Sequence, residues 1–334
     1  MKAMVINKFG RPEVFELKDI PIPEVKPGYV LVKVIASSLN PFEVKLRSGL
    51  LPEFTPQFPA VLNSDVSGVV VKVGENVEMY KVGDEVYGFV GGLRGEEGGA
   101  LAEFVLVDEE LLSIKPSNLD FKSAALFPLV GITAYRAIME TSHIKSGDKV
   151  LIQGAAGGVG HIAIQFAKML EAVVYATVSN EEKAEIAEHL GADYVINYKN
   201  TGVEEYVNQY TDGEGFDVVF DTIGGYNLIN SFKAAKIGGL VLTTNTRASV
   251  DLTLLHHKAL ILKAIFMILP VTTNTNRNEM GNILNEMKKM IEAGNLTIYR
   301  DKTEFKFSEI VEAHKYYEAG ETTAKIALLN DLIS

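Results

Sequence analysis

The feature that most constrains the fold is a run of small residues between a predicted strand at 149–153 and a predicted helix at 158–170. Ala155, Gly157 and Gly160 have A-x-G-x-x-G spacing. Small residues allow the backbone to turn sharply out of a strand, to approach a pyrophosphate closely and to let the following helix pack on the sheet. The helix N-terminus presents free N–H groups and a positive dipole end to such an anion. The sequence therefore predicts a dinucleotide-binding turn.

The residues around this turn alternate between strand and helix patterns. From Ser146 onward, strands are expected at 149–153, 173–178, 194–196, 217–221 and 240–244, and helices at 158–170, 181–190, 203–210 and 226–236. This alternation requires a parallel sheet with right-handed crossovers, which is a doubly wound α/β fold.

The chain before the alternation is rich in β-branched residues and poor in helix patterns. Short strands are expected at 29–37, 66–73, 85–89 and 101–107, which together predict a closed or strongly curved sheet. After the alternation we expect a helix at 279–293, a strand at 304–307, a helix at 308–319 and a strand at 325–329. We interpret this last stretch as the chain returning to the first domain, which gives domains at 1–124 with 271–334 and at 125–270. The glycine-rich loop at 91–99 is expected to be mobile, and is either the border of a site or a plain surface connection.

The end of the predicted strand at 173–178 is where the type of dinucleotide is decided. NAD sites place a carboxylate there for the ribose 2′-hydroxyl, but the position falls near Ser179. Ser179 or Asn180 can hydrogen-bond a 2′-phosphate and Lys183 can supply a cation, which favours NADPH. Ser179 and Glu182 also fit a helix capping box, and acidic neighbours keep NAD open.

Absent residues narrow the chemistry. The chain has no cysteine, and its first histidine is His143, so the β-rich half cannot assemble a catalytic zinc site of the alcohol-dehydrogenase kind. The motifs G-x-S-x-G, H-E-x-x-H and Walker A are also missing, which removes the usual signs of hydrolases and phosphoryl-transfer enzymes. Hydride transfer without a metal remains.

Net charge and hydropathy disfavour two classes of partner. A formal net charge of -11 opposes binding to nucleic acid and to anionic membranes. The richest apolar run, 259–271, is interrupted by Lys263, and the N-terminal residues lack the apolar core of a secretory signal. We therefore expect a cytoplasmic protein with a small-molecule substrate.

Several short stretches, in this order along the chain, resemble the zinc-independent medium-chain dehydrogenase/reductases, and within them the quinone oxidoreductase and zeta-crystallin group. The matching stretches are 40–43 (NPFE), 47–49 (RSG), 64–70 (SDVSGVV), 82–88 (VGDEVYG), 131–135 (GITAY), 154–160 and 216–221 (FDVVFD). The resemblance implies a GroES-like β-barrel catalytic domain with an inserted Rossmann domain, and NADPH that donates a hydride to a quinone or another α,β-unsaturated carbonyl.

The same resemblance implies where NADPH would bind. The matching positions are Asn40 and Thr133 near the nicotinamide, Ala156, Gly157, Gly158 and Val159 at the phosphates, and Ser179, Lys183 and Tyr198 around the 2′-phosphate. Phe266 and Met267 match the loop that lines the nicotinamide pocket, and Lys325 matches a terminal Gly-Lys strand in which alanine replaces the glycine.

Hydride transfer to a conjugated acceptor creates negative charge that donors or solvent must stabilise. Asn40, Lys45 and Arg47 are the candidates, with Asp65 as an organiser; alternatively Arg47 and Asp65 form a structural pair. The chain departs from several relatives at Glu43 and Lys45, where they have aspartate and tyrosine, and also at Leu51 and Asn63. Aromatic stacking of a quinone by those tyrosines is therefore unsupported.

Two other functions remain open. One is an enoyl-thioester reductase that performs the same hydride step, and the other is a non-catalytic NADPH-binding protein of the crystallin kind. Edge strands expected near Val241 and Ile261 would pair across a two-fold axis, which predicts a homodimer.

Overall fold

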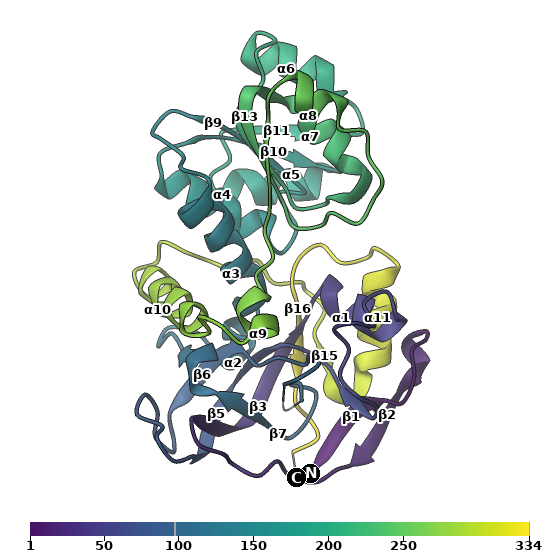
Figure 1. The fold of residues 1–334 in the computed structure, drawn as a ribbon, viewed down its shortest axis with the longest axis vertical. Coiled ribbons are helices and arrows are strands. Elements are labelled where there is room, and N and C mark those ends of the chain that lie inside the picture. The colour runs from purple at the N-terminus through teal and green to yellow at the C-terminus, as the bar shows by residue number, and fades with distance from the viewer. Residues whose placement is uncertain (97, 334) are drawn as a thin grey trace. The chain divides into compact units, whose positions relative to one another are not determined.

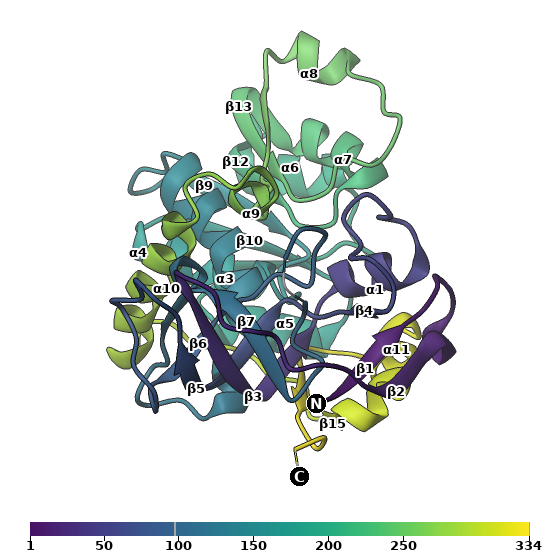
Figure 2. The same cartoon turned by 60° about the horizontal axis from the view of Figure 1, so that its bottom comes forward.

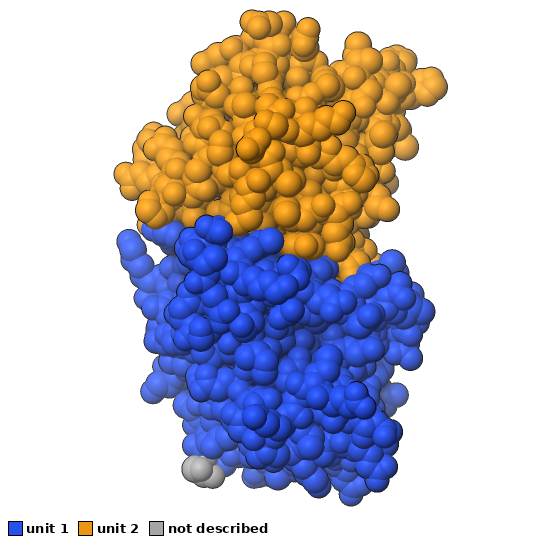
Figure 3. All heavy atoms as spheres, turned by 90° about the vertical axis from the view of Figure 1, so that its left-hand side faces the viewer, with its two compact units in different colours: residues 1–132, 268–334 blue, residues 133–267 orange. Residues whose placement is uncertain are grey.

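The computed structural model describes residues 1–96 and 98–333. The chain divides into two compact units, residues 1–132 with 268–334 and residues 133–267, which Figure 3 distinguishes by colour. Each unit has its own sheets and core and is described by itself.

The second unit is built on a six-stranded parallel sheet, seen in Figure 1. The strand order is β11-β10-β9-β12-β13-β14, with β9 (Lys149–Gln153), β10 (Val173–Val178), β11 (Tyr194–Asn197), β12 (Phe216–Asp221), β13 (Ala235–Thr243) and β14 (Ile261–Ala264). The helices between them are α4 (Gly160–Met169), α5 (Glu181–His189), α6 (Val203–Thr211), α7 (Leu228–Ala234) and α8 (Thr253–His257). Val150, Leu151 and Ile152 of β9 are fully buried at the centre of the sheet, which explains their continuous apolar run.

Two predictions in this unit are wrong. The helix expected at 226–236 ends at Ala234, because the chain is already extended at Ala235 and pairs with β12. Val241 therefore lies in a longer strand that is hydrogen-bonded on both sides, to β12 and to β14. Of the two strands expected at the edge, only the one around Ile261 is an edge strand.

The first unit contains a seven-stranded mixed sheet and a three-stranded antiparallel sheet. The larger one comprises β3 (Tyr29–Leu39), β5 (Asp65–Val73), β6 (Glu85–Phe89), β7 (Phe104–Asp108), β8 (Leu112–Ile114), β15 (Phe305–Lys306) and β16 (Ile326–Leu329), and the smaller one β1 (Lys2–Ile6), β2 (Phe15–Asp19) and β4 (Ala60–Val61). The long strand β3 pairs with β5, β7 and β16, and its register with β5 shifts twice. Such irregularities bend a strand, as the expected curved sheet requires.

The helices of the first unit come from both ends of the chain. They are α1 (Pro41–Ser48), α2 (Phe121–Ala124), α3 (Pro128–Tyr135, which crosses the division between the units), α9 (Leu269–Thr273), α10 (Asn278–Glu292) and α11 (Ile310–Glu318). Helix α11 lies beside the β1–β2 hairpin (Figure 1, Figure 2). Because β16 pairs antiparallel with β3 from Ile326–Leu39 onward, the C-terminal segment completes the first unit.

Several described residues of the glycine-rich loop, 91–96 with 98 and 99, pack against the rest of the first unit. Leu93 is buried, and a Cβ on Gly99 would lie 2.1 Å from the carbonyl oxygen of Leu62. The Glu96 carboxylate forms two hydrogen bonds of 2.9 Å with the guanidinium of Arg277, just before α10.

Candidate functional site

The glycine-rich turn in the second unit joins β9 to α4. Gly154 has a φ of 73°, and the amide of Gly157 donates to its carbonyl at 3.0 Å, which closes the turn. A Cβ on Gly160 would lie 2.3 Å from the carbonyl oxygen of Gly154, so only glycine fits there. Gly157 is exposed, and a Cβ there would meet only one atom within 4 Å, at 3.2 Å. Gly160 is therefore required by the fold, whereas Gly157 leaves the turn open to solvent.

This open turn fits the phosphates of a dinucleotide. Within the described residues, the amides of Gly158 and Val159 donate to no protein acceptor, and they directly precede the first turn of α4. Unsatisfied N–H groups at a helix N-terminus bind anions well. Ala156 is almost fully buried below them.

The second part of the site is the end of β10. Asn180, and not Ser179, is the N-cap residue of α5, because the Asn180 side-chain oxygen accepts from the amide of Lys183 at 3.0 Å. The expected capping box of Ser179 and Glu182 is therefore wrong. The Lys183 side chain is half-buried and makes no hydrogen bond or ion pair with any other described residue. Tyr198 directly follows the neighbouring strand β11 and is 49% exposed, so both side chains are available to a ligand at this edge of the sheet.

A buried polar network below the turn was not predicted. Gln153 Oε1 accepts from Asn227 Nδ2 at 2.9 Å and from Ser231 Oγ at 2.7 Å. Asp221 Oδ1 accepts from the amide of Gly224 at 2.8 Å, and Oδ2 accepts from Ser231 Oγ at 3.0 Å. Gln153 and Asp221 are polar residues at the ends of apolar strands. This position is the feature of the sequence that could have indicated the network. The network fixes the loop after β12.

The first unit holds a second buried polar group, which we call the Lys325 cluster; it consists of Ser38, Asn40, Glu43, Ser64, Asp65 and Lys325. All six side chains are at most 4% exposed. Asn40 is the N-cap residue of α1, and its amide N–H donates to Glu43 Oε2 at 2.9 Å, as in a capping box. Glu43 Oε1 accepts from Ser64 Oγ at 2.6 Å. The cluster thus links α1, β3, β5 and β16.

The ammonium of Lys325 contacts three other members of the cluster. Its Nζ donates to Ser38 Oγ at 2.8 Å and to Asn40 Oδ1 at 2.5 Å, and lies 3.6 Å from Asp65 Oδ2. Burial lowers the pKa of Lys325, and the Asp65 and Glu43 carboxylates oppose that effect. Burial also raises the pKa of Glu43, and the nearby Asp65 raises it further. The single cation is what makes burial of two acidic groups tolerable.

The orientation of the Asn40 amide is set by these charges. Its oxygen accepts from Lys325, while its Nδ2 donates to Asp65 Oδ2 at 2.9 Å and to Glu43 Oε1 at 3.4 Å. With its polar atoms engaged and its side chain fully buried, Asn40 holds the cluster together.

The other candidates on α1 have separate surroundings. Arg47 is buried and does not pair with Asp65, as one alternative proposed; its guanidinium donates to the carbonyl of Gly10 at 2.6 Å and forms an ion pair with Glu318 of α11. Lys45 is half-buried, the least buried of the four catalytic candidates.

Three further predicted residues belong to the second unit. Thr133 is almost fully buried in α3. Phe266 and Met267 follow β14, where Phe266 is 45% exposed and Met267 is buried. Of the two, Phe266 therefore presents the larger surface to a ligand.

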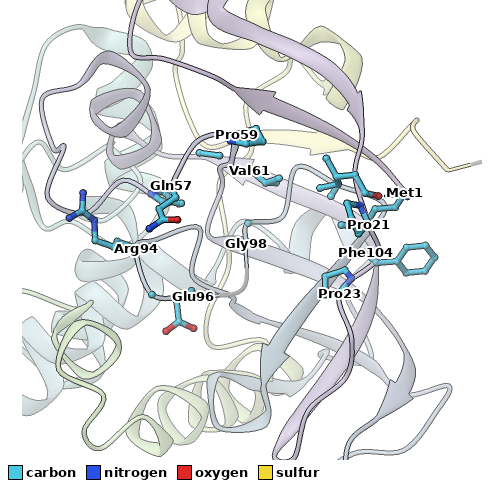
Figure 4. Close-up of a pocket in the computed structure, with 16 residues that line it drawn as sticks. Met1, Pro21, Pro23, Gln57, Pro59, Val61, Arg94, Glu96, Gly98 and Phe104 are labelled. Carbon is cyan, nitrogen blue, oxygen red and sulfur yellow. Dashed lines mark hydrogen bonds between the residues drawn. The ribbon is translucent and has the colours of Figure 1, made fainter.

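A cavity of about 560 Å³ lies in the first unit, and none of the predicted site residues lines it. Arg94 and Gln57 are at one end, and Met1, Pro21 and Phe104 are at the other (Figure 4). The described loop residues Arg94, Gly95, Glu96, Gly98 and Gly99 form part of its wall.

Among the described residues, no three or more His, Cys, Asp or Glu side chains are grouped to hold a metal ion. In the same part of the chain, no helix has the length and apolar character needed to cross a membrane.

Comparison with known proteins places the chain in a family. Residues 26–117 match the model described as alcohol dehydrogenase GroES-like domain, and residues 158–289 match the one described as zinc-binding dehydrogenase. This chain itself has no cysteine and no histidine before His143.

Two plant proteins match over 98% of the chain and 79% of their own length. They are the chloroplastic NADPH-dependent alkenal/one oxidoreductase of Arabidopsis thaliana, at 36% identity, and the 2-methylene-furan-3-one reductase of Solanum lycopersicum, at 34%. Among solved structures, the Escherichia coli quinone oxidoreductase complexed with NADPH superposes with a TM-score of 0.88 at 28% identity, covering 98% of this chain and all of that one. These matches bear out the GroES-like domain and the Rossmann sheet. The chain belongs to the zinc-independent quinone oxidoreductase group of the medium-chain dehydrogenase/reductases.

Proposed function

We propose that the protein is an NADPH-dependent oxidoreductase that transfers a hydride to an α,β-unsaturated carbonyl compound or a quinone. The observation that carries this proposal is the open glycine turn before α4, together with the Lys183 side chain in the first turn of α5, the helix that follows β10. Among the described residues, that side chain has no hydrogen-bond or ion-pair partner. The domains expected at 125–270 and at 1–124 with 271–334 are proposed as the NADPH-binding and catalytic domains, respectively.

The second unit carries most of the residues that would hold NADPH. The backbone of Ala156, Gly157, Gly158 and Val159 would bind the pyrophosphate. Ser179, Lys183 and Tyr198 would surround the 2′-phosphate, because the first two follow β10 and the third follows the adjacent β11. Thr133, Phe266 and Met267 are the proposed contacts of the nicotinamide.

When bound, NADPH supplies the hydride, and the protein contributes binding, orientation and electrostatics. Negative charge develops on the acceptor oxygen and must be stabilised by donors or solvent. Lys45 is the candidate donor, since it is the least buried of the four. Asn40, Arg47, Asp65 and Lys325 are all buried with protein partners, so we assign them to organising the site. Water supplies the final proton.

Enones are the favoured acceptors. The two plant relatives that match over 98% of the chain are named for alkenals, enones or a methylene furanone, each a conjugated carbonyl compound. The chain also has Lys45 and Leu51 where several relatives have the tyrosines proposed to stack on a quinone. Quinone reduction is therefore the second activity.

A homodimer is proposed on the geometry of the second unit's sheet. Its edge strand β14 presents Ile261, which is 60% exposed. An exposed apolar edge strand invites pairing with a second copy of the chain. The cytoplasm remains the proposed compartment, on the argument from the sequence.

The test is consumption of NADPH with a panel of an alkenal, a cyclic enone, 1,4-benzoquinone, 1,2-naphthoquinone and crotonyl-CoA, with the products identified by mass spectrometry. We expect saturated carbonyl products from the alkenal and the enone, and slower turnover of the quinones. Turnover of crotonyl-CoA alone would favour an enoyl-thioester reductase. NADPH binding without turnover of any acceptor would favour a non-catalytic protein.

A further inference from the structure

We infer that Asp65 is a positioning residue for helix α3, and that through the first turn of this helix it determines where Thr133 lies. The part of this inference that concerns Thr133 rests on the proposed function, in which Thr133 contacts the nicotinamide.

The two oxygens of the Asp65 carboxylate have separate partners. Oδ2 accepts from Ser38 Oγ at 2.6 Å and from Asn40 Nδ2 at 2.9 Å, inside the Lys325 cluster. Oδ1 accepts from the backbone amide of Leu129 at 2.8 Å. Asp65 is fully buried and joins the cluster to α3 through these hydrogen bonds.

The start of α3 needs such a partner. The first N–H groups of a helix have no acceptor within the helix. Pro128, the first residue, has no N–H at all, so Leu129 supplies the first donor of the helix. A carboxylate at this end also interacts favourably with the helix dipole, and more strongly when it is partly shielded from water.

The Lys325 ammonium lies beside the Asp65 carboxylate. It lies 3.6 Å from Oδ2 and donates to Ser38 Oγ, which in turn donates to Asp65. Glu43 is the other buried acid of the cluster, and its Oε1 accepts from Asn40 Nδ2 at 3.4 Å. Removal of the ammonium would leave Asp65 and Glu43 buried without a cation, so the capping of α3 depends on Lys325 as well as on Asp65.

The capped turn leads directly to a proposed cofactor contact. Thr133 lies four residues after Leu129, which is about one helical turn. Helix α3 continues into a π-helical segment, Arg136–Thr141. A change in the first turn therefore shifts Thr133.

The experiment compares Asp65→Asn with a matched control, Asp120→Asn, using the full chain. Asp120 is also a helix-capping carboxylate of the first unit: its Oδ1 accepts from the amide of Ser123 at 2.7 Å in α2. Hydrogen–deuterium exchange is followed separately for peptides that cover α2 and α3. We expect Asp65→Asn to accelerate exchange in α3 by about tenfold and to leave α2 unchanged, and Asp120→Asn to do the reverse.

Steady-state kinetics is the second readout. In Asp65→Asn, the KM for NADPH should rise by about fivefold while kcat changes by less than about twofold, and Asp65→Glu should recover part of the loss. Uniform acceleration of exchange over the whole chain would show that Asp65 is only a stability residue, and unchanged exchange in α3 would also overturn the inference. If Asp65→Asn does not fold, Ser38→Ala removes one neutral donor to Asp65 and should raise exchange in α3 alone by about threefold; no change there would overturn the inference.

The two proposals fail in different ways. If wild-type protein turns over no acceptor, the proposed function fails, whereas the exchange of α3 still tests the link to Asp65. If turnover is normal but the KM for NADPH is the same in Asp65→Asn and the wild type, the link to Thr133 fails alone.

Discussion

At the residue scale, two glycines of one motif have different tasks. Gly160 has no room for a side chain, because a Cβ would lie 2.3 Å from the carbonyl oxygen of Gly154. Gly157 has room and is exposed. The spacing alone does not separate the glycine that builds the turn from the one that leaves space for the ligand.

Alanine at each position should separate stability from binding. Gly160→Ala is expected to lower the free energy of unfolding by about 1–3 kcal/mol, because the clash is with backbone. Gly157→Ala should change it by less than about 1 kcal/mol and weaken NADPH binding by about tenfold. Urea unfolding and fluorescence titration with NADPH measure the two quantities. Equal losses of stability in the two variants would contradict this account of the turn.

His314 is a buried titratable residue of α11. Neither ring nitrogen has a hydrogen-bond partner among the described residues, and the ring contacts Phe15 at 5.0 Å between centroids. Burial lowers the pKa of His314 to about 3, and the positive charge of Arg47 contributes in the same direction. The folded protein therefore keeps this imidazole neutral.

Acid should destabilise the protein through this histidine. Below its unfolded pKa of about 6.5 the unfolded chain binds a proton that the folded chain does not, so stability falls as the pH drops toward about 3, by at most about 1.4 kcal/mol per pH unit. His314→Phe should flatten that dependence. Urea unfolding at several pH values measures it, with exposed His256→Gln as the control. The same slope in His314→Phe and the wild type would reject the assignment.

At the element scale, one ion pair fastens the glycine-rich loop to the start of α10. Arg277 is 6% exposed, forms two hydrogen bonds with Glu96, and its Nε lies 2.7 Å from Asp108 Oδ2. Breaking a buried pair by removing one partner costs far more than breaking an exposed one.

We expect Arg277→Met to lower stability by about 3–5 kcal/mol and to expose the loop at 91–99 to proteases, because two carboxylates lose their cation. Lys289→Met is the matched control, since its pair with Glu286 is exposed, and should cost less than about 0.5 kcal/mol. Urea unfolding and limited proteolysis with mass spectrometry measure both effects. Comparable losses in the two variants would show that burial of the Arg277 pair contributes nothing.

The sequence predicts elements with strong local patterns and misses those that depend on distant partners. The strands at 149–153, 173–178 and 85–89 begin and end where expected, because apolar runs bounded by turn residues specify them. The start of β13 at Ala235 was missed, since pairing with β12 decides it. The union of Asn40 with Lys325, 285 positions later, has no local signal, because antiparallel pairing of β16 with β3 creates it.

At the scale of the whole molecule, the six-stranded sheet ends at β14, whose Ile261 is 60% exposed. If two copies pair along this strand, a charge introduced there would lie close to the same charge of the second copy across the two-fold axis, and the two would repel. Ile261→Glu should convert the dimer to a monomer, whereas Tyr226→Glu, at another exposed apolar residue of the same unit, should not. Light scattering measures the mass of each. A monomeric wild type would refute the proposed homodimer.

The most direct test of the central claim is the ratio of kcat/KM for NADPH to kcat/KM for NADH, with an enone as acceptor, in the wild type and in Lys183→Ala. The Lys183 side chain has no partner among the described residues and lies three residues after Asn180, the cap of α5, so its charge is available to the 2′-phosphate. We expect the wild type to prefer NADPH, and Lys183→Ala to reduce that preference by about tenfold while NADH turnover is unchanged. Equal use of both cofactors by the wild type, or an unchanged ratio in Lys183→Ala, would contradict the account.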